Sequence, residues 1–288
     1  MDNNLSPLAD TEVHYLWSAR ADAEFKVLVG HCGALPRASA VRPAVLYLTD
    51  ANGYFGLAVD LIRSMQLSRH LPRLLVVGIG YRAGANAETI PVRTRDLTPT
   101  PDPAFVRLFP RQSAMGGAAA MLAFITEELM PWVGGNYGAD PAEASYFGHS
   151  LGGLFGTYVL LREPAVFRSY IIGSPSLWWD NDAIFAFEER CAQEHDDLAA
   201  TVYFGIGADE THEGRLREAQ NMPPDERAKT GAWYIDMVAD IARMAGRLQR
   251  RRYPALNLRS ETFPGEFHIT VPPLVLSRGL RYVFGAPH

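Results

Sequence analysis

Short runs of apolar residues recur along this chain at intervals that leave room for a helix between them. Buried parallel strands carry such runs, because helices cover both of their faces. The runs that we expect to form these strands are Ala44–Thr49, Leu74–Gly80, Ala144–Gly148, Tyr170–Gly173, Thr201–Gly207 and Leu258–Phe263. Two segments nearer the N-terminus, Thr11–Ala19 and Glu24–Gly30, have the pattern of a β-hairpin.

Between these runs, apolar residues recur every three or four positions, which is the spacing of one face of an α-helix. This pattern is clear in Ala118–Trp132 and Trp233–Leu248. Strands alternating with helices predict an α/β fold with a mainly parallel central sheet and helices on both faces. Because no flexible linker interrupts the pattern, we expect one domain over residues 1–288.

Two stretches depart from the alternation. Arg82–Met115 is rich in proline, which disfavours helices and central strands, and Thr211–Gly231 is charged and contains Pro223-Pro224. Long connections in compact domains often serve a site, so we expect rim loops around 82–115 and 211–231. Plain surface insertions fit both stretches equally well.

Composition narrows the class of protein. Apolar residues make up 48% and charged residues 20% of the chain, with a net charge of −5, as in a soluble globular enzyme. That charge offers no basic surface for nucleic acid or an anionic membrane. Cys32 and Cys191 lie far apart outside any C-x-x-C pattern, which favours buried thiols over a disulfide.

The N-terminal segment Met1–Asp10 is polar and acidic and lacks the features of a secretory signal. No apolar run approaches the length that crosses a bilayer. We therefore expect a cytoplasmic protein. The helical pattern of Trp233–Leu248 could present a second apolar face to another copy, giving a homo-oligomer, although packing on the sheet explains the pattern better.

The pentapeptide Gly148-His149-Ser150-Leu151-Gly152 matches the G-x-S-x-G nucleophile elbow. This turn exposes a serine above the sheet, and its glycines let neighbouring backbones pass close by. A strand-like run precedes the motif and the helix-like run Leu151–Leu161 follows it, which is the setting that the motif requires. The sequence predicts Ser150 as a catalytic nucleophile, with His149 as a packing residue beside it.

In folds with this elbow, the acid and then the histidine follow the serine along the chain. The histidines after Ser150 are His195, His212, His268 and His288. His268 fits best as the general base, because it follows the last predicted strand, at the sheet edge where ligands bind. The acid should follow Thr201–Gly207, where Asp209 and Glu210 both qualify and spacing does not choose between them.

Acyl transfer also needs N–H donors for the oxyanion. One should be the backbone N–H of Leu151, directly after the nucleophile, and the other should follow the strand Ala44–Thr49. We expect the second donor to be the N–H of Asn52, with Ala51 as the alternative. A turn that caps the next helix is compatible with the same residues.

Four stretches carry a resemblance to a known family. They are Leu46–Asn52, Arg95–Thr100 (Arg-Asp-Leu-Thr-Pro-Thr), Gly148–Phe155 and Ser174–Trp179 (Ser-Pro-Ser-Leu-Trp-Trp). From about Val45 onward, the chain resembles the esterase branch of the α/β-hydrolases that includes siderophore (enterobactin-type) esterases, esterase D and mycolyltransferases. It looks most similar to the siderophore-esterase group.

The resemblance implies an α/β-hydrolase fold with Ser150 and His268 as the catalytic pair. The family's Gly-x-x-Glu pattern matches Gly207–Glu210, which favours Glu210 as the acid. Two departures affect the site: relatives often carry glycine where Ala51 stands, and Thr211–Gly231 is longer than the corresponding loop in relatives.

Trp178 and Trp179 follow a predicted strand and could form an aromatic wall for the substrate, although core packing is as good an explanation for Trp179. Arg93 and Arg95 could pair with an anionic substrate, or with Asp96 or Asp102 as structural partners.

No zinc, calcium or dinucleotide motif is present in the sequence, so we expect neither a metal nor a cofactor. The leading hypothesis is a serine esterase that acts through an acyl-enzyme on a small-molecule ester or lactone, such as a siderophore. An acyltransferase or thioesterase could use the same acyl-enzyme, and a non-catalytic binding module on this scaffold is the remaining alternative.

Overall fold

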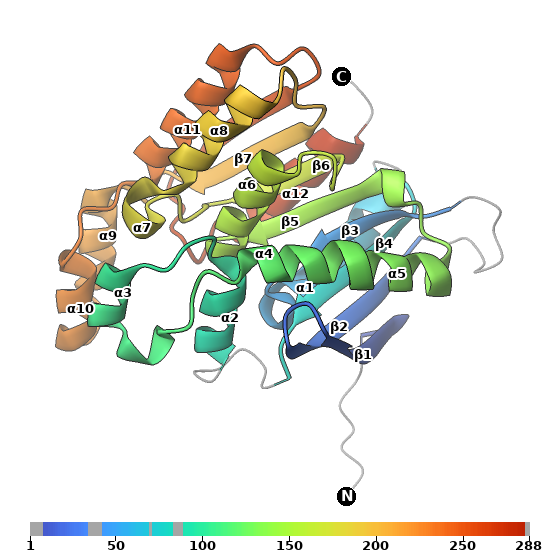
Figure 1. Cartoon of the computed structure of the whole chain (residues 1–288), viewed down its shortest axis with the longest axis horizontal. Helices are drawn as coiled ribbons and strands as arrows, with labels where there is room; N and C mark the ends of the chain where they lie inside the picture. The colour runs from blue at the N-terminus through green and yellow to red at the C-terminus, as the bar shows by residue number, and fades with distance from the viewer. Residues whose placement is uncertain (1–7, 34–41, 69–70, 83–88, 286–288) are drawn as a thin grey trace, which may run out of the picture.

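A computed structural model describes residues 8–33, 42–68, 71–82 and 89–285. It contains an eight-stranded sheet with the strand order β1-β2-β4-β3-β5-β6-β7-β8 (Figure 1). The strands are β1 (Thr11–Ser18), β2 (Ala23–Cys32), β3 (Ala44–Leu48), β4 (Leu74–Gly80), β5 (Ala144–His149), β6 (Ser169–Gly173), β7 (Thr201–Gly207) and β8 (Asn257–Phe263).

Strands β4, β3, β5, β6, β7 and β8 run parallel, and β2 joins β4 and β1 antiparallel. In the centre, Tyr47 of β3 pairs with Val77 of β4 on one side and with Tyr146 of β5 on the other. The expected α/β fold and the N-terminal hairpin are confirmed. The parallel strands all end at one edge of the sheet, where a ligand site is expected in such folds.

The helices and short helical turns cover both faces of this sheet, except that α3, α9 and α10 lie to one side of it (Figure 1). They are α1 (Ala51–Leu67), α2 (Thr89–Leu97), α3 (Pro103–Leu108), η1 (Pro110–Gln112), α4 (Ala118–Ala123), η2 (Phe124–Leu129), α5 (Met130–Tyr137), η3 (Pro141–Glu143), α6 (Leu151–Arg162), α7 (Trp179–Asp182), α8 (Ile184–Glu194), α9 (His212–Ala219), α10 (Pro224–Gly231), α11 (Met237–Arg251) and α12 (Pro272–Phe284).

Two buried apolar clusters lie on opposite faces of the sheet. Successive strand residues point to opposite sides, so Val45 and Tyr47 join one cluster while Leu46 and Leu48 join the other. Helices α1 and α12 contribute to the second cluster, and α4, α5, α6, α8 and α11 contribute to the first. The apolar face of α11 packs on the sheet, and a homo-oligomer stays a prediction.

The helix expected over Ala118–Trp132 is longer than predicted and contains a π-helical turn, η2, between α4 and α5. Pro131 follows this turn and has no N–H to give to a helical hydrogen bond, which the wider turn accommodates. The helix expected from Trp233 begins only at Met237, because the Asp236 side chain accepts a hydrogen bond from the N–H of Ala239 and caps it there.

The prediction of rim loops around 82–115 and 211–231 was wrong as to secondary structure where α2, α3, α9 and α10 form; residues 83–88 lie outside the described residues. Pro91, Pro103, Pro110 and Pro224 fall in first helical turns, whose N–H groups have no partner within the helix, whereas Pro99 and Pro101 lie between α2 and α3. Asp102 caps α3 by accepting from Ala104 and Phe105, and Thr211 caps α9 by accepting from Gly214.

Cys32 and Cys191 are both buried and free, as expected. Within the described ranges, none of the helices combines the length and the apolar character that crossing a membrane requires.

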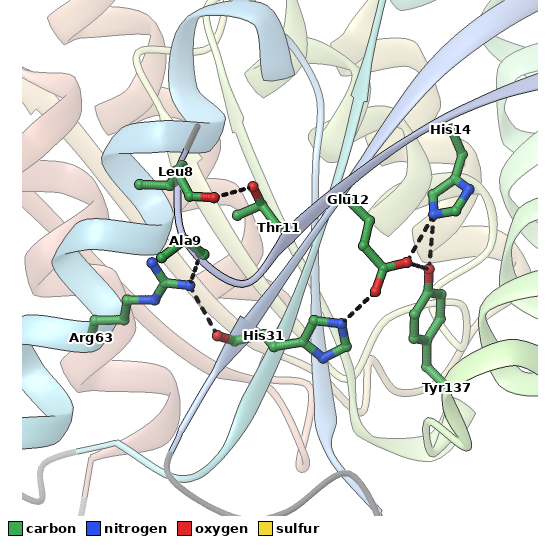
Figure 2. Close-up of polar contacts among 8 residues, drawn as sticks. All are labelled: Leu8, Ala9, Thr11, Glu12, His14, His31, Arg63 and Tyr137. Atoms are coloured by element: carbon green, nitrogen blue, oxygen red, sulfur yellow. Dashed lines mark hydrogen bonds and ion pairs between the residues drawn. The ribbon is translucent and has the colours of Figure 1, made fainter. Parts of the chain in front are cut away.

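A polar cluster on the hairpin joins β1 and β2 to α5 (Figure 2). The carboxylate of Glu12 lies 3.0 Å from His31 Nε2 and 3.1 Å from His14 Nε2, and it accepts a hydrogen bond from the Tyr137 hydroxyl at 2.8 Å. Burial alone would raise the pKa of Glu12, but these hydrogen bonds outweigh burial and lower its pKa from 4.5 to about 2. The cluster therefore stabilises the fold when Glu12 is ionised.

We predict that Glu12→Gln lowers the free energy of unfolding at pH 7 by about 1–2 kcal/mol, less than the pKa shift implies because the carboxylate is partly exposed. A lowered pKa stabilises above the unfolded value, so the difference from wild type should shrink as the pH falls below 4.5 towards 2. Urea unfolding at several pH values measures it. Glu143→Gln, which removes an exposed pair with Arg168, is the control and should change little.

Candidate active site

Ser150 lies on a tight turn between β5 and α6, with φ 60° and ψ −119°. A positive φ is strained for a residue other than glycine, and such strain gathers at functional sites. The flanking glycines make the turn possible: a Cβ at Gly148 would come within 2.3 Å of the Gly152 carbonyl oxygen, and one at Gly152 within 2.5 Å of Thr49 Oγ1. The predicted elbow geometry is therefore present at the carboxyl edge of the sheet.

His268 follows β8, and its Nδ1 lies 2.6 Å from Oε2 of Glu210. Glu210 is 1% exposed, and its other oxygen accepts hydrogen bonds from Ser174 Oγ at 2.6 Å and from the Gly207 N–H at 2.9 Å. Both carboxylate oxygens are thus engaged, which fixes the side chain behind the imidazole. Ser150, Glu210 and His268 line one cavity of about 230 Å³.

The structure separates the two carboxylates that spacing left equal. Asp209 pairs with Arg217, whose Nη2 lies 3.0 Å from its Oδ1. Asp209 therefore has a partner on α9 instead of the imidazole, and Glu210 is the carboxylate beside His268.

The other histidines after Ser150 lie elsewhere. His212 begins α9, where its Nδ1 accepts a hydrogen bond from Ile235 at 3.4 Å and its ring lies 4.4 Å from that of Tyr234. His195 ends α8. His288 lies outside the described residues.

His149 is 2% exposed, and its ring centroid lies 4.5 Å from that of His268. Burial, assisted by the nearby His268 and Arg93, lowers the pKa of His149 well below its ordinary value. His149 therefore stays neutral near pH 7 and packs as an uncharged ring against His268, consistent with the packing role expected for it.

The residues expected to form the oxyanion hole begin two helices. Leu151 is the first residue of α6 and Asn52 the second of α1, so their N–H groups belong to first turns without intrahelical partners. The Asn52 side chain is held at the end of β4: its Nδ2 donates to the Tyr81 carbonyl at 2.9 Å, and its Oδ1 accepts from the Tyr81 N–H at 2.7 Å.

A hydrogen-bonded chain ties these two helix starts together. The Tyr146 hydroxyl lies 2.9 Å from Thr49 Oγ1, beside the start of α1, and donates to the Gly152 carbonyl at 2.8 Å, in the first turn of α6. The arrangement can hold two helix N-termini beside Ser150, where their dipoles favour negative charge.

Of the expected substrate-binding residues, Trp178 lines the cavity. Trp179 is 1% exposed, and its indole N–H donates to the Thr100 carbonyl at 2.9 Å, so it packs in the core. Arg95 pairs with Asp96 at 2.6 Å and is not among the residues that line the Ser150 cavity. The placements of Trp179 and Arg95 give no support for the substrate contacts expected of them.

Arg93 likewise has a structural partner, but a different one from those expected. Its guanidinium binds both carboxylate oxygens of Asp50, at 2.6 and 2.8 Å. The pair fixes α2 against the residue that precedes α1.

Further residues reach the cavity that the sequence analysis did not select. Ser176, whose Oγ lies 3.5 Å from Ser150 Oγ, follows β6 at the same sheet edge, and that position could have indicated it. Most of the others come from the segment 211–231, which was expected to be a loop. The sequence analysis therefore did not predict that helices would bring their side chains to the cavity. These other residues are Arg215, Glu218, Met222, Thr230, Met237 and Ile269.

The two ends of the segment that carries α9 and α10 lie next to each other. The Met237 N–H donates to the carbonyl of Glu210 at 3.1 Å, which closes the segment at its base. In the part of the chain that the structure describes, no group of three or more histidine, cysteine, aspartate or glutamate side chains is arranged to hold a metal ion.

Comparison with known proteins places this chain in a family. The model of the family described as "Putative esterase" matches residues 34–234. The chain is 28% identical to the ferri-bacillibactin esterase BesA of Bacillus subtilis, over 99% of this chain and 94% of that protein. It is 33% identical to a siderophore enterobactin esterase of Emericella nidulans, over 53% of this chain and 52% of that protein.

Solved structures share the fold. The BES protein from Bacillus cereus superimposes with a TM-score of 0.81 at 24% identity, covering 99% of both chains. An IroE-like serine hydrolase from Shewanella oneidensis has a TM-score of 0.76 at 21% identity, covering 95% of this chain and 80% of that one. The fold is thus that of the α/β-hydrolases, and the chain belongs to the esterase family whose model it matches, as a carboxylic-ester hydrolase.

Proposed function

We propose that this esterase works through a triad in which Ser150 is the nucleophile, His268 the general base and Glu210 the acid. Ser150 Oγ attacks the ester carbonyl while His268 takes its proton, and Glu210 stabilises the imidazolium that forms. The N–H groups of Leu151 and Asn52 hold the oxyanion. His268 then protonates the leaving alcohol, and water releases the acid from the acyl-enzyme by the same steps.

The observation that carries this proposal is the contact between His268 Nδ1 and the buried carboxylate of Glu210 at 2.6 Å. A proton on Nδ1 satisfies that carboxylate and leaves Nε2 as the basic nitrogen, the tautomer that a general base needs. Ser150 supplies a partly buried hydroxyl in the same cavity, on the kind of strained turn that carries a nucleophile.

We further propose that the natural substrate is an ester or lactone of a siderophore. The relatives support this class: proteins named for ferri-bacillibactin, enterobactin and triacetylfusarinine C esterase activity match this chain at 28 to 33% identity. The Trp178 side chain gives the cavity an apolar wall of the kind that holds aromatic or aliphatic groups.

We predict that Ser150→Ala lowers hydrolysis of p-nitrophenyl acetate and butyrate by about 10⁴-fold or more, because no other group replaces the nucleophile. A fluorophosphonate probe, followed by intact mass, should label the wild type and not the variant. Ser176→Ala is the matched control, since it removes the hydroxyl 3.5 Å away and should still be labelled. Labelling of the Ser150→Ala protein would contradict the assignment.

We predict that Glu210→Gln lowers kcat by about 10³- to 10⁴-fold with little change in KM, because the amide no longer stabilises the imidazolium. Asp209→Asn, one residue away, should leave kcat within about threefold of wild type, because Asp209 pairs with Arg217 on the surface. The reverse result, a larger loss in Asp209→Asn, would move the acid to Asp209.

The substrate class is tested with a catecholate trilactone and a hydroxamate triester, each with and without iron, with products followed by mass spectrometry. We predict cleavage of at least one to its monomer acids by the wild type and none by Ser150→Ala. Turnover of p-nitrophenyl esters without cleavage of either siderophore would reject the substrate class and leave the esterase mechanism standing.

A further inference from the structure

One wall of the Ser150 cavity comes from the segment that carries α9 and α10. Arg215 and Glu218 lie three residues apart on α9, hence on one face of that helix, and both line the cavity with Ser150 and His268. The wall therefore brings a guanidinium and a carboxylate to the reaction site, on a helix that the mechanism does not use.

Arg215 differs from its neighbour on the same helix. Its Nη1 is buried and has no hydrogen-bond partner among the described residues, whereas Arg217 is exposed and donates to Asp209 at 3.0 Å. Burial lowers the pKa of Arg215 and the negative charges of Glu210 and Glu218 raise it, but a guanidinium stays charged in any protein environment. A buried donor of a charged group calls for an acceptor.

The carboxylates near Arg215 do not provide that acceptor. Glu210 uses its two oxygens for His268, Ser174 and the Gly207 N–H. In the described part of the chain, no ion pair within 4.0 Å joins Arg215 to Glu218 or to any other carboxylate. Arg215 therefore brings an unpaired donor to the wall of the cavity that Ser150 and His268 line.

We propose that Arg215 selects esters that carry a neutral carbonyl oxygen, such as that of an amide or ketone, a few bonds from the scissile ester. The inference rests on the proposed function, because it places the ester at Ser150. A carbonyl oxygen accepts the buried N–H without adding charge, whereas a carboxylate would meet the negative charges of Glu210 and Glu218. Arg215 is therefore a specificity-determining residue of the hydrolysis.

The test compares three p-nitrophenyl esters of similar acyl length, with the uncatalysed rate subtracted. Valerate has a plain alkyl chain, levulinate places a ketone at the fourth carbon, and hemisuccinate places a carboxylate there. In Arg215→Met, the ratio of kcat/KM for levulinate to kcat/KM for valerate should fall by about 10- to 100-fold, because one charge-assisted hydrogen bond to the levulinate ketone is lost. Arg217→Met should leave the levulinate-to-valerate ratio unchanged.

The ratio between two esters in one variant does not depend on how much of that variant is folded. An unchanged levulinate-to-valerate ratio in Arg215→Met would overturn the proposal. If the wild type preferred hemisuccinate and Arg215→Met lost that preference, the proposal of a neutral carbonyl ligand would be overturned, because Arg215 would then bind a carboxylate. Failure of the wild type to hydrolyse any ester or to react with fluorophosphonate would instead reject the mechanism at Ser150.

Discussion

The close crossing of the first turn of α6 over the ends of the central strands is the constraint on which the rest of this site depends. A side chain at Gly152 would strike Thr49 at the end of β3, and one at Gly153 would come within 2.7 Å of the Gly173 carbonyl at the end of β6. Because only hydrogen atoms fit there, α6 begins directly above the sheet, and Ser150 takes a positive φ to reach it. The position of the Ser150 hydroxyl thus follows from how closely the α6 backbone approaches the strand ends.

The second requirement is a buried carboxylate that several strand ends hold in common. Glu210 follows β7 and binds Ser174 after β6 and His268 after β8, so its side chain joins three neighbouring strand ends. Removing such a carboxylate from water is costly unless its oxygens are well hydrogen-bonded, and here they are. The same bonds that make the burial tolerable also orient the imidazole.

The sequence predicted the sheet well, because buried parallel strands are apolar throughout, and it predicted the elbow because glycine spacing records a steric need. Spacing left Asp209 and Glu210 equal, and only the family resemblance favoured Glu210, because Arg217, the partner of Asp209, is brought to it by the folded α9. The density of prolines suggested loops at 82–115 and 211–231, yet a proline in a first turn leaves a helix intact. Arg215 was not selected as a site residue because the stretch that contains it was expected to be a loop. From the sequence, Trp179 and Arg95 could lie either in the core or at the rim of the site. Their hydrogen bonds to Thr100 and Asp96 in the folded chain show that both have structural partners.

The bond between the Met237 N–H and the Glu210 carbonyl has a consequence for how such enzymes diversify. The chain leaves the sheet after Glu210 and returns beside it, so residues 211–236 form an excursion with adjoining ends. Loops with adjoining ends tolerate exchange and change of length at small entropic cost. Residues 211–236 can therefore be replaced or changed in length during evolution, which alters one wall of the cavity while the sheet and the residues proposed for catalysis keep their positions.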